Sequence, residues 1–397
     1  MNRDDFNMLN SDIIYFDNGA TTLKPKQVID DIMEYYNEYS ANSHRGDYDI
    51  SLKVDHKIDE VRNLVKEFIG AKENNEIIFT GNATDALNKI IFGYFKYNLK
   101  KGDEVLLTTS EHASLILPWQ ELADEIGIII KYIPLDTNHQ VTLDSVINTI
   151  TPNTKVIALS HITNVIGDIR PIKEITNYAH QHDILVLVDA AQSVPHMKVD
   201  VQDLDIDFLT FSGHKMCGPT GIGVLYGKEK YLNNTHPLIY GGGMNSSFEY
   251  SGKRIYKDIP YLLEAGTPNI AGIIGLGSSI KYLNNIGMDK ITKYEQELKE
   301  YAVNKLKTLS NIIIYNENSK SGIITFNIKD IFPQDVALYL NKYNICIRAG
   351  SHCAKMLKED LGIKNTCRLS LYFYNTKEEI DKLVDILNNS NILEEII

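Results

Sequence analysis

The middle of the chain alternates short apolar runs with stretches in which apolar residues recur every three or four positions. Runs rich in Val, Ile and Leu are typical of strands buried on both faces, and the stretches between them are typical of amphipathic helices. This alternation predicts a mostly parallel, doubly wound α/β sheet. We predict strands at Ile77–Thr80, Glu104–Thr109, Ile128–Leu135, Val156–Ile162, Leu185–Asp189, Phe208–Phe211 and Ile222–Tyr226, and helices at Asp85–Phe95, Leu115–Ile126 and Ile172–His182.

The pattern changes near residue 275. A long amphipathic stretch covers Ile280–Leu309, and shorter strand and helix patterns follow it at Ile312–Tyr315, Gly322–Asn327, Gln334–Tyr343 and Lys377–Asn388. This order predicts a second, smaller α+β domain. We therefore expect an N-terminal segment (1–25) that packs with the small domain, a large domain (26–275) and a small C-terminal domain (276–397).

Composition narrows the class of protein. The 397 residues are 43% apolar and carry a net charge of -12, which argues against a nucleic-acid partner because such a partner needs clustered positive charge. The four cysteines form no CxxC pair, so neither a metal site nor a disulfide framework is predicted, and a reducing cytoplasm is expected. Met1–Ser11 lacks the apolar centre of a signal peptide, and no apolar run approaches the roughly 18 residues that span a bilayer.

Polar residues follow the predicted strands, where ligands bind in open α/β sheets. The small residues of Gly81–Asp85 open a helix, which suits either a phosphate cradle or an ordinary capped helix start. His112 could stack on a flat ring, move protons or simply be hydrogen-bonded. Asp189 ends a buried strand, so its carboxylate needs a cationic partner, such as a protonated ring nitrogen, or serves as a helix cap. Three further polar residues also lie at or just after the ends of predicted strands: His161, Asn164 and Gln192.

Lys215 is the strongest candidate for covalent chemistry. It follows a buried strand through Ser212, Gly213 and His214 and precedes a glycine-rich turn. Most lysines are solvated surface residues, but an amine desolvated in such a place can form a Schiff base with an aldehyde. The glycine run fits neither GxxxxGK[ST] nor a strand–GxGxxG–helix unit, so nucleotide binding is not predicted.

The small domain contributes a second nucleophile. Gly350 and Ser351 indicate a turn, which places Cys353 on or near a mobile loop with His352 and Arg348 close enough to favour its thiolate. The alternative is a buried, inert cysteine. Arg368 suits a bidentate grip on a substrate carboxylate, or else a salt bridge.

Together these segments resemble the fold-type I pyridoxal-phosphate enzymes of the class V aminotransferase family. Within that family the chain is similar to cysteine desulfurases of the SufS/CsdA type (NifS-like, group II). The resemblance covers nearly the whole chain, and the order and spacing of its segments make it specific. The matching stretches are Tyr15–Thr22, Ser43–Gly46, Ser110–His112, Ser160–Gly167, Asp189–Gln192, Ser212–Lys215, Glu264–Asn269 and the turn that carries Cys353.

The resemblance implies that the fold has a seven-stranded sheet and that the cofactor is pyridoxal phosphate, with L-cysteine as substrate and L-alanine as product. Lys215 would hold the cofactor and move protons, and Cys353 would accept the sulfur as a persulfide. The roles implied for other residues are pairing with the ring nitrogen (Asp189), stacking on the ring (His112), contact with the phenolic oxygen (Gln192, with Asn164 nearby), phosphate binding (Ala83, Thr84, Ser212, His214 and, across a homodimer, Thr267) and substrate binding (Arg368, Arg348, Asn164, His44, Arg45).

The sequence departs from the family pattern at several positions, among them Gly19, Ser351, Ala354 and Cys217. These differences leave open which sulfur acceptor is served. A short loop around Cys353 resembles the branch that uses a SufE- or SufU-like acceptor in iron–sulfur cluster assembly or other sulfur trafficking. The alternatives are a selenocysteine lyase or cysteine sulfinate desulfinase and a class V aminotransferase. A non-catalytic scaffold is a further alternative, which the presence of Lys215, Asp189 and Cys353 together argues against.

Overall fold

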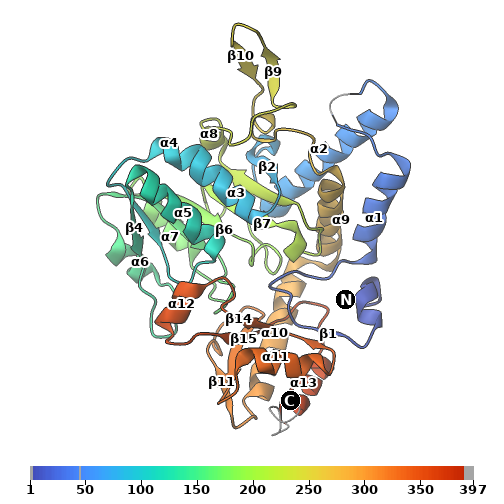
Figure 1. The fold of residues 1–397 in the computed structure, drawn as a ribbon, viewed down its shortest axis with the longest axis vertical. Coiled ribbons are helices and arrows are strands. Elements are labelled where there is room, and N and C mark those ends of the chain that lie inside the picture. Colours follow the sequence, from blue (N-terminus) through green and yellow to red (C-terminus); the bar gives the residue numbers. More distant parts are fainter. Residues whose placement is uncertain (1–2, 44–45, 389–397) are drawn as a thin grey trace.

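The largest sheet lies at the centre of Figure 1 and has helices on both faces. The computed structural model describes residues 3–43 and 46–388. Within these residues the sheet has seven strands in the order β2-β8-β7-β6-β5-β3-β4, and β8 runs in the opposite direction to the other six. The predicted mostly parallel sheet is confirmed. The strands are β2 (Ile77–Thr80), β3 (Glu104–Leu107), β4 (Ile129–Tyr132), β5 (Thr154–Ser160), β6 (Leu185–Asp189), β7 (Phe208–Ser212) and β8 (Gly223–Gly227).

Both faces of this sheet are buried, which explains its unbroken apolar runs. Successive side chains of a strand point to opposite faces. In β6, Val186 and Val188 join one core cluster, while Leu187 between them joins the cluster on the other face. The first cluster is covered by α2 (Asp49–Ile69), α7 (Ile172–His180) and α9 (Ile270–Ile286), and the second by α3 (Ala83–Ile90) and α5 (Ala113–Ile126).

A second, antiparallel sheet lies below the first in Figure 1 and has its own core. Its order is β11-β12-β15-β14, and the strands are β11 (Ile312–Ile314), β12 (Ile323–Ile328), β15 (Thr366–Ser370) and β14 (Arg348–Gly350). Its core includes residues from α10 (Met288–Leu306), α11 (Pro333–Asn341) and α13 (Lys377–Leu387). The division of the chain at residues 25 and 275 stays a prediction.

The N-terminal segment contacts both cores. Strand β1 (Ile14–Tyr15) pairs in parallel with β13 (Ile345–Cys346), and Ile14 and Phe16 are buried in the small-sheet core. Phe6 and Leu23 pack instead in the core of the large sheet. The segment therefore links the two sheets by apolar contacts on both sides.

The long amphipathic stretch forms two helices rather than one. Helix α9 ends at Ile286 and α10 begins at Met288, because Gly287 between them has a φ of 94°, a conformation that side chains disfavour. The glycines of α9 serve packing. A Cβ on Gly277 would lie 2.5 Å from Val61 Cγ2 of α2, so glycine permits the close approach of the two helices.

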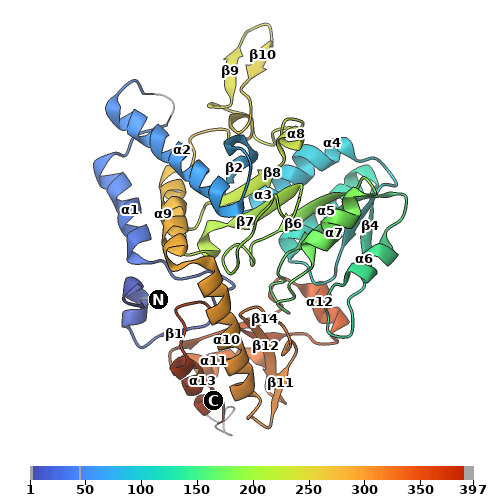
Figure 2. The same ribbon diagram turned by 180° about the vertical axis from the view of Figure 1, so that it is seen from behind.

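A hairpin of β9 (Asn245–Phe248) and β10 (Arg254–Tyr256) projects from the body of the molecule in both views (Figures 1 and 2). Phe248 and Tyr250 are exposed near its end. Within the described ranges, no helix combines the length and the apolar character needed to cross a membrane.

Candidate active site

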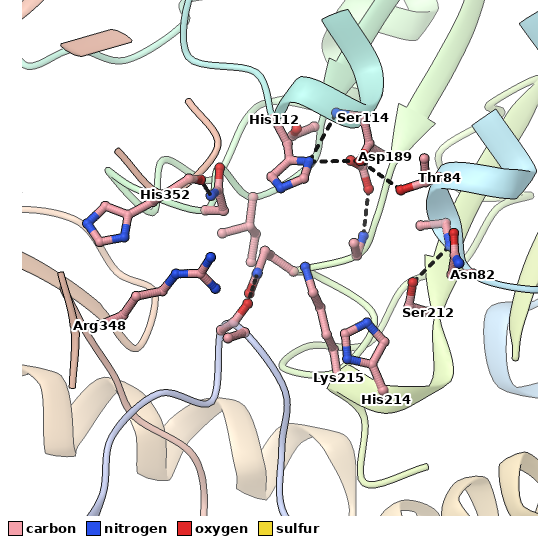
Figure 3. Close-up of a pocket in the computed structure, with 18 of the residues that line it drawn as sticks. Asn82, Thr84, His112, Ser114, Asp189, Ser212, His214, Lys215, Arg348 and His352 are labelled. Carbon is pink, nitrogen blue, oxygen red and sulfur yellow. Dashed lines mark hydrogen bonds between the residues drawn. The ribbon is translucent and has the colours of Figure 1, made fainter. Parts of the chain in front are cut away.

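A cavity of about 400 Å³ lies where the carboxyl ends of β5, β6 and β7 meet the first turns of α3 and α5 and residues of the small sheet. Its size suits a cofactor with a small substrate. Figure 3 shows Asn82, Thr84 and Ser212 at one end and Arg348 and His352 at the other. The structure brings together in its wall most of the predicted residues: Ala83, Thr84, His112, Asn164, Asp189, Gln192, Ser212, His214, Lys215, Arg348 and Arg368.

Lys215 points into this cavity from the turn that follows β7 (Figure 3). Desolvation lowers the pKa of its amine to about 8, although the carboxylate of Asp189 acts in the opposite direction. A substantial fraction of the amine is therefore neutral near physiological pH, which is the form that reacts with an aldehyde.

Asp189 is the last residue of β6 and is buried. The backbone N–H of Ala191 donates to its Oδ1 at 3.0 Å, and no cation among the described residues forms an ion pair with it. Burial raises the pKa of this carboxyl. A cationic ligand group beside it would offset the cost of desolvation and keep it ionised.

His112 is held at the first turn of α5 as a neutral ring. Its Nδ1 accepts a hydrogen bond from the backbone N–H of Ser114 at 3.1 Å. Burial, together with the charge of Lys215, lowers the pKa of His112 to about 4. The Ser114 hydroxyl also lies 2.7 Å from the hydroxyl of Thr84, so it links the two predicted residues. Sequence reasoning missed Ser114, because its contact with Thr84 exists only in the tertiary structure.

The end of the cavity near α3 offers donors for a phosphate. Asn82 caps α3 by accepting the N–H of Asp85 at 2.9 Å, which leaves the N–H of Ala83 to donate to the Ser212 hydroxyl at 2.8 Å. Burial lowers the pKa of His214 to about 4, so this ring is also neutral. Backbone N–H groups and hydroxyls at a helix start suit an anion.

Arg368 lies at the opposite end, and its guanidinium is buried. It donates to Asp17 Oδ1 and to the backbone carbonyl of Asn164, both at 3.0 Å. Burial lowers the pKa of this arginine, and Asp17 counteracts the effect. Asp17 was not predicted, although it lies in the N-terminal stretch that resembles the family.

Cys353 is exposed on a four-residue turn between β14 and α12 (Lys355–Asp360). It lines a groove next to the cavity, which it shares with His112 and Ala113. The turn is held in place, because the N–H of Ala113 donates to the Cys353 carbonyl at 2.8 Å and Asn164 Nδ2 donates to the His352 carbonyl at 2.7 Å. His352 and Cys353 both have positive φ values, 54° and 57°.

The expected help of His352 in favouring the thiolate is wrong. Burial and the charge of Arg368 lower the pKa of His352 to about 2, so the ring carries no positive charge. Its Nε2 lies 3.0 Å from both the carbonyl and the hydroxyl of Thr366. The ring anchors the turn instead of activating the thiol.

Some predicted residues lie elsewhere. Thr267 is exposed and is absent from the wall of the cavity described for this chain, with Asn42 Nδ2 3.4 Å from its hydroxyl. His44 and Arg45 lie outside the described residues. Cys217 is fully buried, and burial raises the pKa of its thiol to about 12, so it stays protonated.

The residues of the cavity fit pyridoxal phosphate. Buried polar atoms normally have hydrogen-bond partners, yet several around this cavity have none in the described part of the chain. Together with the carboxylate of Asp189, which forms no ion pair with any residue that the structure describes, these atoms form a set that a polar ring and an amino-acid substrate would satisfy. They are Asn164 Oδ1, Gln192 Oε1, His352 Nδ1 and Arg368 Nε.

Comparison with known proteins identifies the family. Residues 14–383 match the family "Aminotransferase class-V". A probable cysteine desulfurase of Halalkalibacterium halodurans is 44% identical over 375 residues, covering 94% of this chain and 92% of the relative. The apo cysteine desulfurase of Thermococcus onnurineus has a TM-score of 0.93 at 38% identity over 97% of this chain and 96% of that one. The cysteine desulfurase CsdA of Escherichia coli also has a TM-score of 0.93, at 32% identity over 100% and 98%.

The chain therefore belongs to the class-V aminotransferase family. It is an enzyme of the cysteine desulfurase type with pyridoxal phosphate as its cofactor, and the predicted fold and cofactor are confirmed.

Proposed function

We propose that this enzyme removes the sulfur of L-cysteine, holds it as a persulfide on Cys353 and releases L-alanine. The observation that carries the proposal is that Cys353 is exposed and lies beside the cavity. Its backbone carbonyl accepts a hydrogen bond from Ala113, the first residue of α5 and the neighbour of His112. Transfer of an amino group alone has no use for a thiol at this place. An exposed thiol can meet both the substrate and a second protein.

Bound in the cavity, pyridoxal phosphate supplies an electron sink beside the substrate carbon. Lys215 would hold it covalently and Asp189 would pair with the ring nitrogen. The neutral ring of His112 would contact the ring face, with Gln192 and Asn164 near the phenolic oxygen. The phosphate would be held by Ala83, Thr84, Ser212 and His214.

The chain's own residues then act on the cysteine. Arg368 and Arg348 would bind the substrate carboxylate, as guanidinium groups suit this role. The neutral amine of Lys215 would take the proton from the substrate carbon and later return one. These two roles need an amine with a lowered pKa, and burial lowers that of Lys215 to about 8.

Sulfur transfer balances without an outside oxidant. The thiolate of Cys353 attacks the substrate sulfur, so a sulfur–sulfur bond forms and the carbon–sulfur bond of the substrate breaks. The electron pair of the broken bond stays on the carbon fragment, which takes up a proton and leaves as alanine. Release of the sulfur from Cys353 then requires an acceptor thiol.

We also propose that the enzyme acts as a homodimer in which Thr267 reaches the phosphate of the other copy. Thr267 is exposed on its own chain, which supports this role. A SufE- or SufU-like protein is the proposed acceptor, for iron–sulfur cluster assembly or other sulfur trafficking. A reducing compartment such as the cytoplasm suits the four free cysteines.

The test of the proposed function is the stoichiometry of the two products. With L-cysteine and a reductant, we expect the purified enzyme to release sulfide and alanine in equal amounts. Because one carbon–sulfur bond breaks per turnover, each alanine must be matched by one sulfur. A keto acid that keeps the sulfur, formed in place of alanine and without release of sulfide, would support an aminotransferase instead.

The pKa of Lys215 predicts how cofactor uptake depends on pH. The neutral amine is the reactive form, so the rate at which cofactor-free enzyme takes up pyridoxal phosphate should rise with pH through a midpoint near 8. An ordinary lysine, with a pKa of about 10.4, would be less than about 1% neutral at that pH. Stopped-flow measurement of the visible absorbance between pH 6 and 10 checks this. A midpoint near 10 would contradict the desolvated amine, and the Lys215→Ala variant serves as the control that lacks covalent uptake.

A further inference from the structure

Four consecutive backbone carbonyls after β5 accept hydrogen bonds from side chains of residues 316–368. The carbonyl of Asn164 accepts from Arg368 Nη1 at 3.0 Å, and that of Val165 accepts from the hydroxyl of Thr325. The Ile166 carbonyl accepts from Asn316 Nδ2 and the Gly167 carbonyl from Ser319 Oγ, both at 2.7 Å. We call Asn316, Ser319 and Thr325 the carbonyl clamp.

The residues of the carbonyl clamp are buried. Thr325 is fully buried on β12, and Asn316 and Ser319 are nearly so. The Asn316 side chain also donates to the Ile323 carbonyl at 2.8 Å and accepts the N–H of Thr325 at 2.9 Å, which fixes its orientation. A buried side chain held on both sides in this way has little freedom to relax when a partner is removed.

The carbonyl clamp can approach the loop of residues 164–167 closely because residue 167 is a glycine. Gly167 has a φ of 69°, and a Cβ at this position would lie 2.0 Å from Ser321 Oγ and 2.9 Å from Ser319 Oγ. Any larger residue would push the loop and the 319–321 segment apart.

The clamped loop is itself the anchor of two parts of the site. The side chain of Asn164 donates to the His352 carbonyl in the turn that carries Cys353. The backbone carbonyl of Asn164 accepts from Arg368, the proposed carboxylate ligand. None of the three clamp residues lines the cavity that holds Lys215 and Asp189.

We propose that Asn316, Ser319 and Thr325 are positioning residues for sulfur transfer, acting through the backbone of residues 164–167. They set the distance between the substrate held by Arg368 and the thiol of Cys353. This inference rests on the proposed function, since it assigns the residues to the same reaction.

The test compares three variants, two at Thr325 and one at a control position. Thr325→Val removes the donor and keeps the shape, and Thr325→Ser keeps the donor and removes only the methyl group. Thr176→Val is the matched control, because Thr176 is also fully buried and donates to a backbone carbonyl, that of Ile172 at 2.8 Å, but within α7. Hydrogen exchange of amides 163–168 is measured in cofactor-free protein, and KM for L-cysteine and the single-turnover rate of persulfide formation are measured in the holoenzyme.

In Thr325→Val we expect exchange of amides 163–168 to quicken about tenfold, which is the effect of losing one buried hydrogen bond. We expect KM to rise and persulfide formation to slow by about the same factor, with the cofactor absorbance unchanged. In Thr325→Ser the exchange rate, KM and the rate of persulfide formation should all stay close to the wild-type values, and Thr176→Val should change none of them.

Equal behaviour of Thr325→Val and Thr176→Val in exchange and kinetics would overturn the positioning role. Faster exchange with unchanged KM and persulfide rate would also overturn it, since the clamp would then serve the fold alone. Failure of the proposed function is recognised separately, because the wild-type holoenzyme would then release no sulfide from L-cysteine whatever the exchange data show.

Discussion

Replacing Cys353 by alanine should lower sulfide and alanine release from L-cysteine by at least about 100-fold, because the nucleophile that receives the sulfur is removed. The change should leave the fold and the cofactor intact. Cys353 is exposed and its side chain lies in the groove beside the cavity rather than in the cavity wall. The visible absorbance of the bound cofactor should therefore match that of the wild type, and sulfide and alanine assays measure the loss.

Cys346→Ala is the matched control for this variant. Cys346 is a free cysteine on β13, and burial raises the pKa of its thiol, so it should play no part in sulfur transfer. Full activity of Cys353→Ala would contradict the persulfide mechanism. It would favour a selenocysteine lyase or a cysteine sulfinate desulfinase, whose leaving groups depart without an enzyme thiol, and selenocysteine would be the next substrate to try.

Replacing Lys215 by alanine should lower turnover by at least about 1,000-fold, because this one side chain both holds the cofactor and moves the protons. Desolvation already lowers the pKa of this amine to about 8. The free space left in the cavity should admit a small primary amine, so ethylamine should restore part of the proton transfer. The measurements are turnover and the cofactor absorbance with and without the added amine.

The Lys215→Arg variant tests whether positive charge alone can replace the two functions of Lys215, which are holding the cofactor covalently and transferring protons. Arginine keeps a positive charge near Asp189, but it is not deprotonated in proteins and takes no part in imine chemistry. We expect this variant to be as inactive as Lys215→Ala and to gain nothing from ethylamine. Residual activity of Lys215→Arg within tenfold of the wild type would show that another residue moves the protons.

Much of the large sheet could be predicted because its strands are buried on both faces. Such strands must be apolar along their whole length, and β2 and β6 begin and end where the sequence pattern placed them. Where one amphipathic pattern continues through a break, the pattern alone does not show the break. The stretch Ile280–Leu309 is divided at Gly287, because a positive φ there interrupts the helix without changing the hydrophobic pattern.

The sequence by itself determined which residues lie together at the carboxyl ends of the strands. Asp189 ends β6, and Lys215 follows β7, the strand that pairs with β6, so the parallel sheet brings them to one edge. Chain order and strand ends are local properties, and they are sufficient for this part of the site.

Only the tertiary structure decided how the small sheet completes the site. The contact of Arg368 with Asn164 joins residues 204 positions apart, and that of Asn316 with Ile166 joins residues 150 apart. The neutral state of His352 has the same origin, because burial against Thr366 and Arg368 sets its pKa. Such contacts and the burial of these groups depend on how the two sheets pack against each other. The pattern of neighbouring residues in the sequence therefore does not predict them.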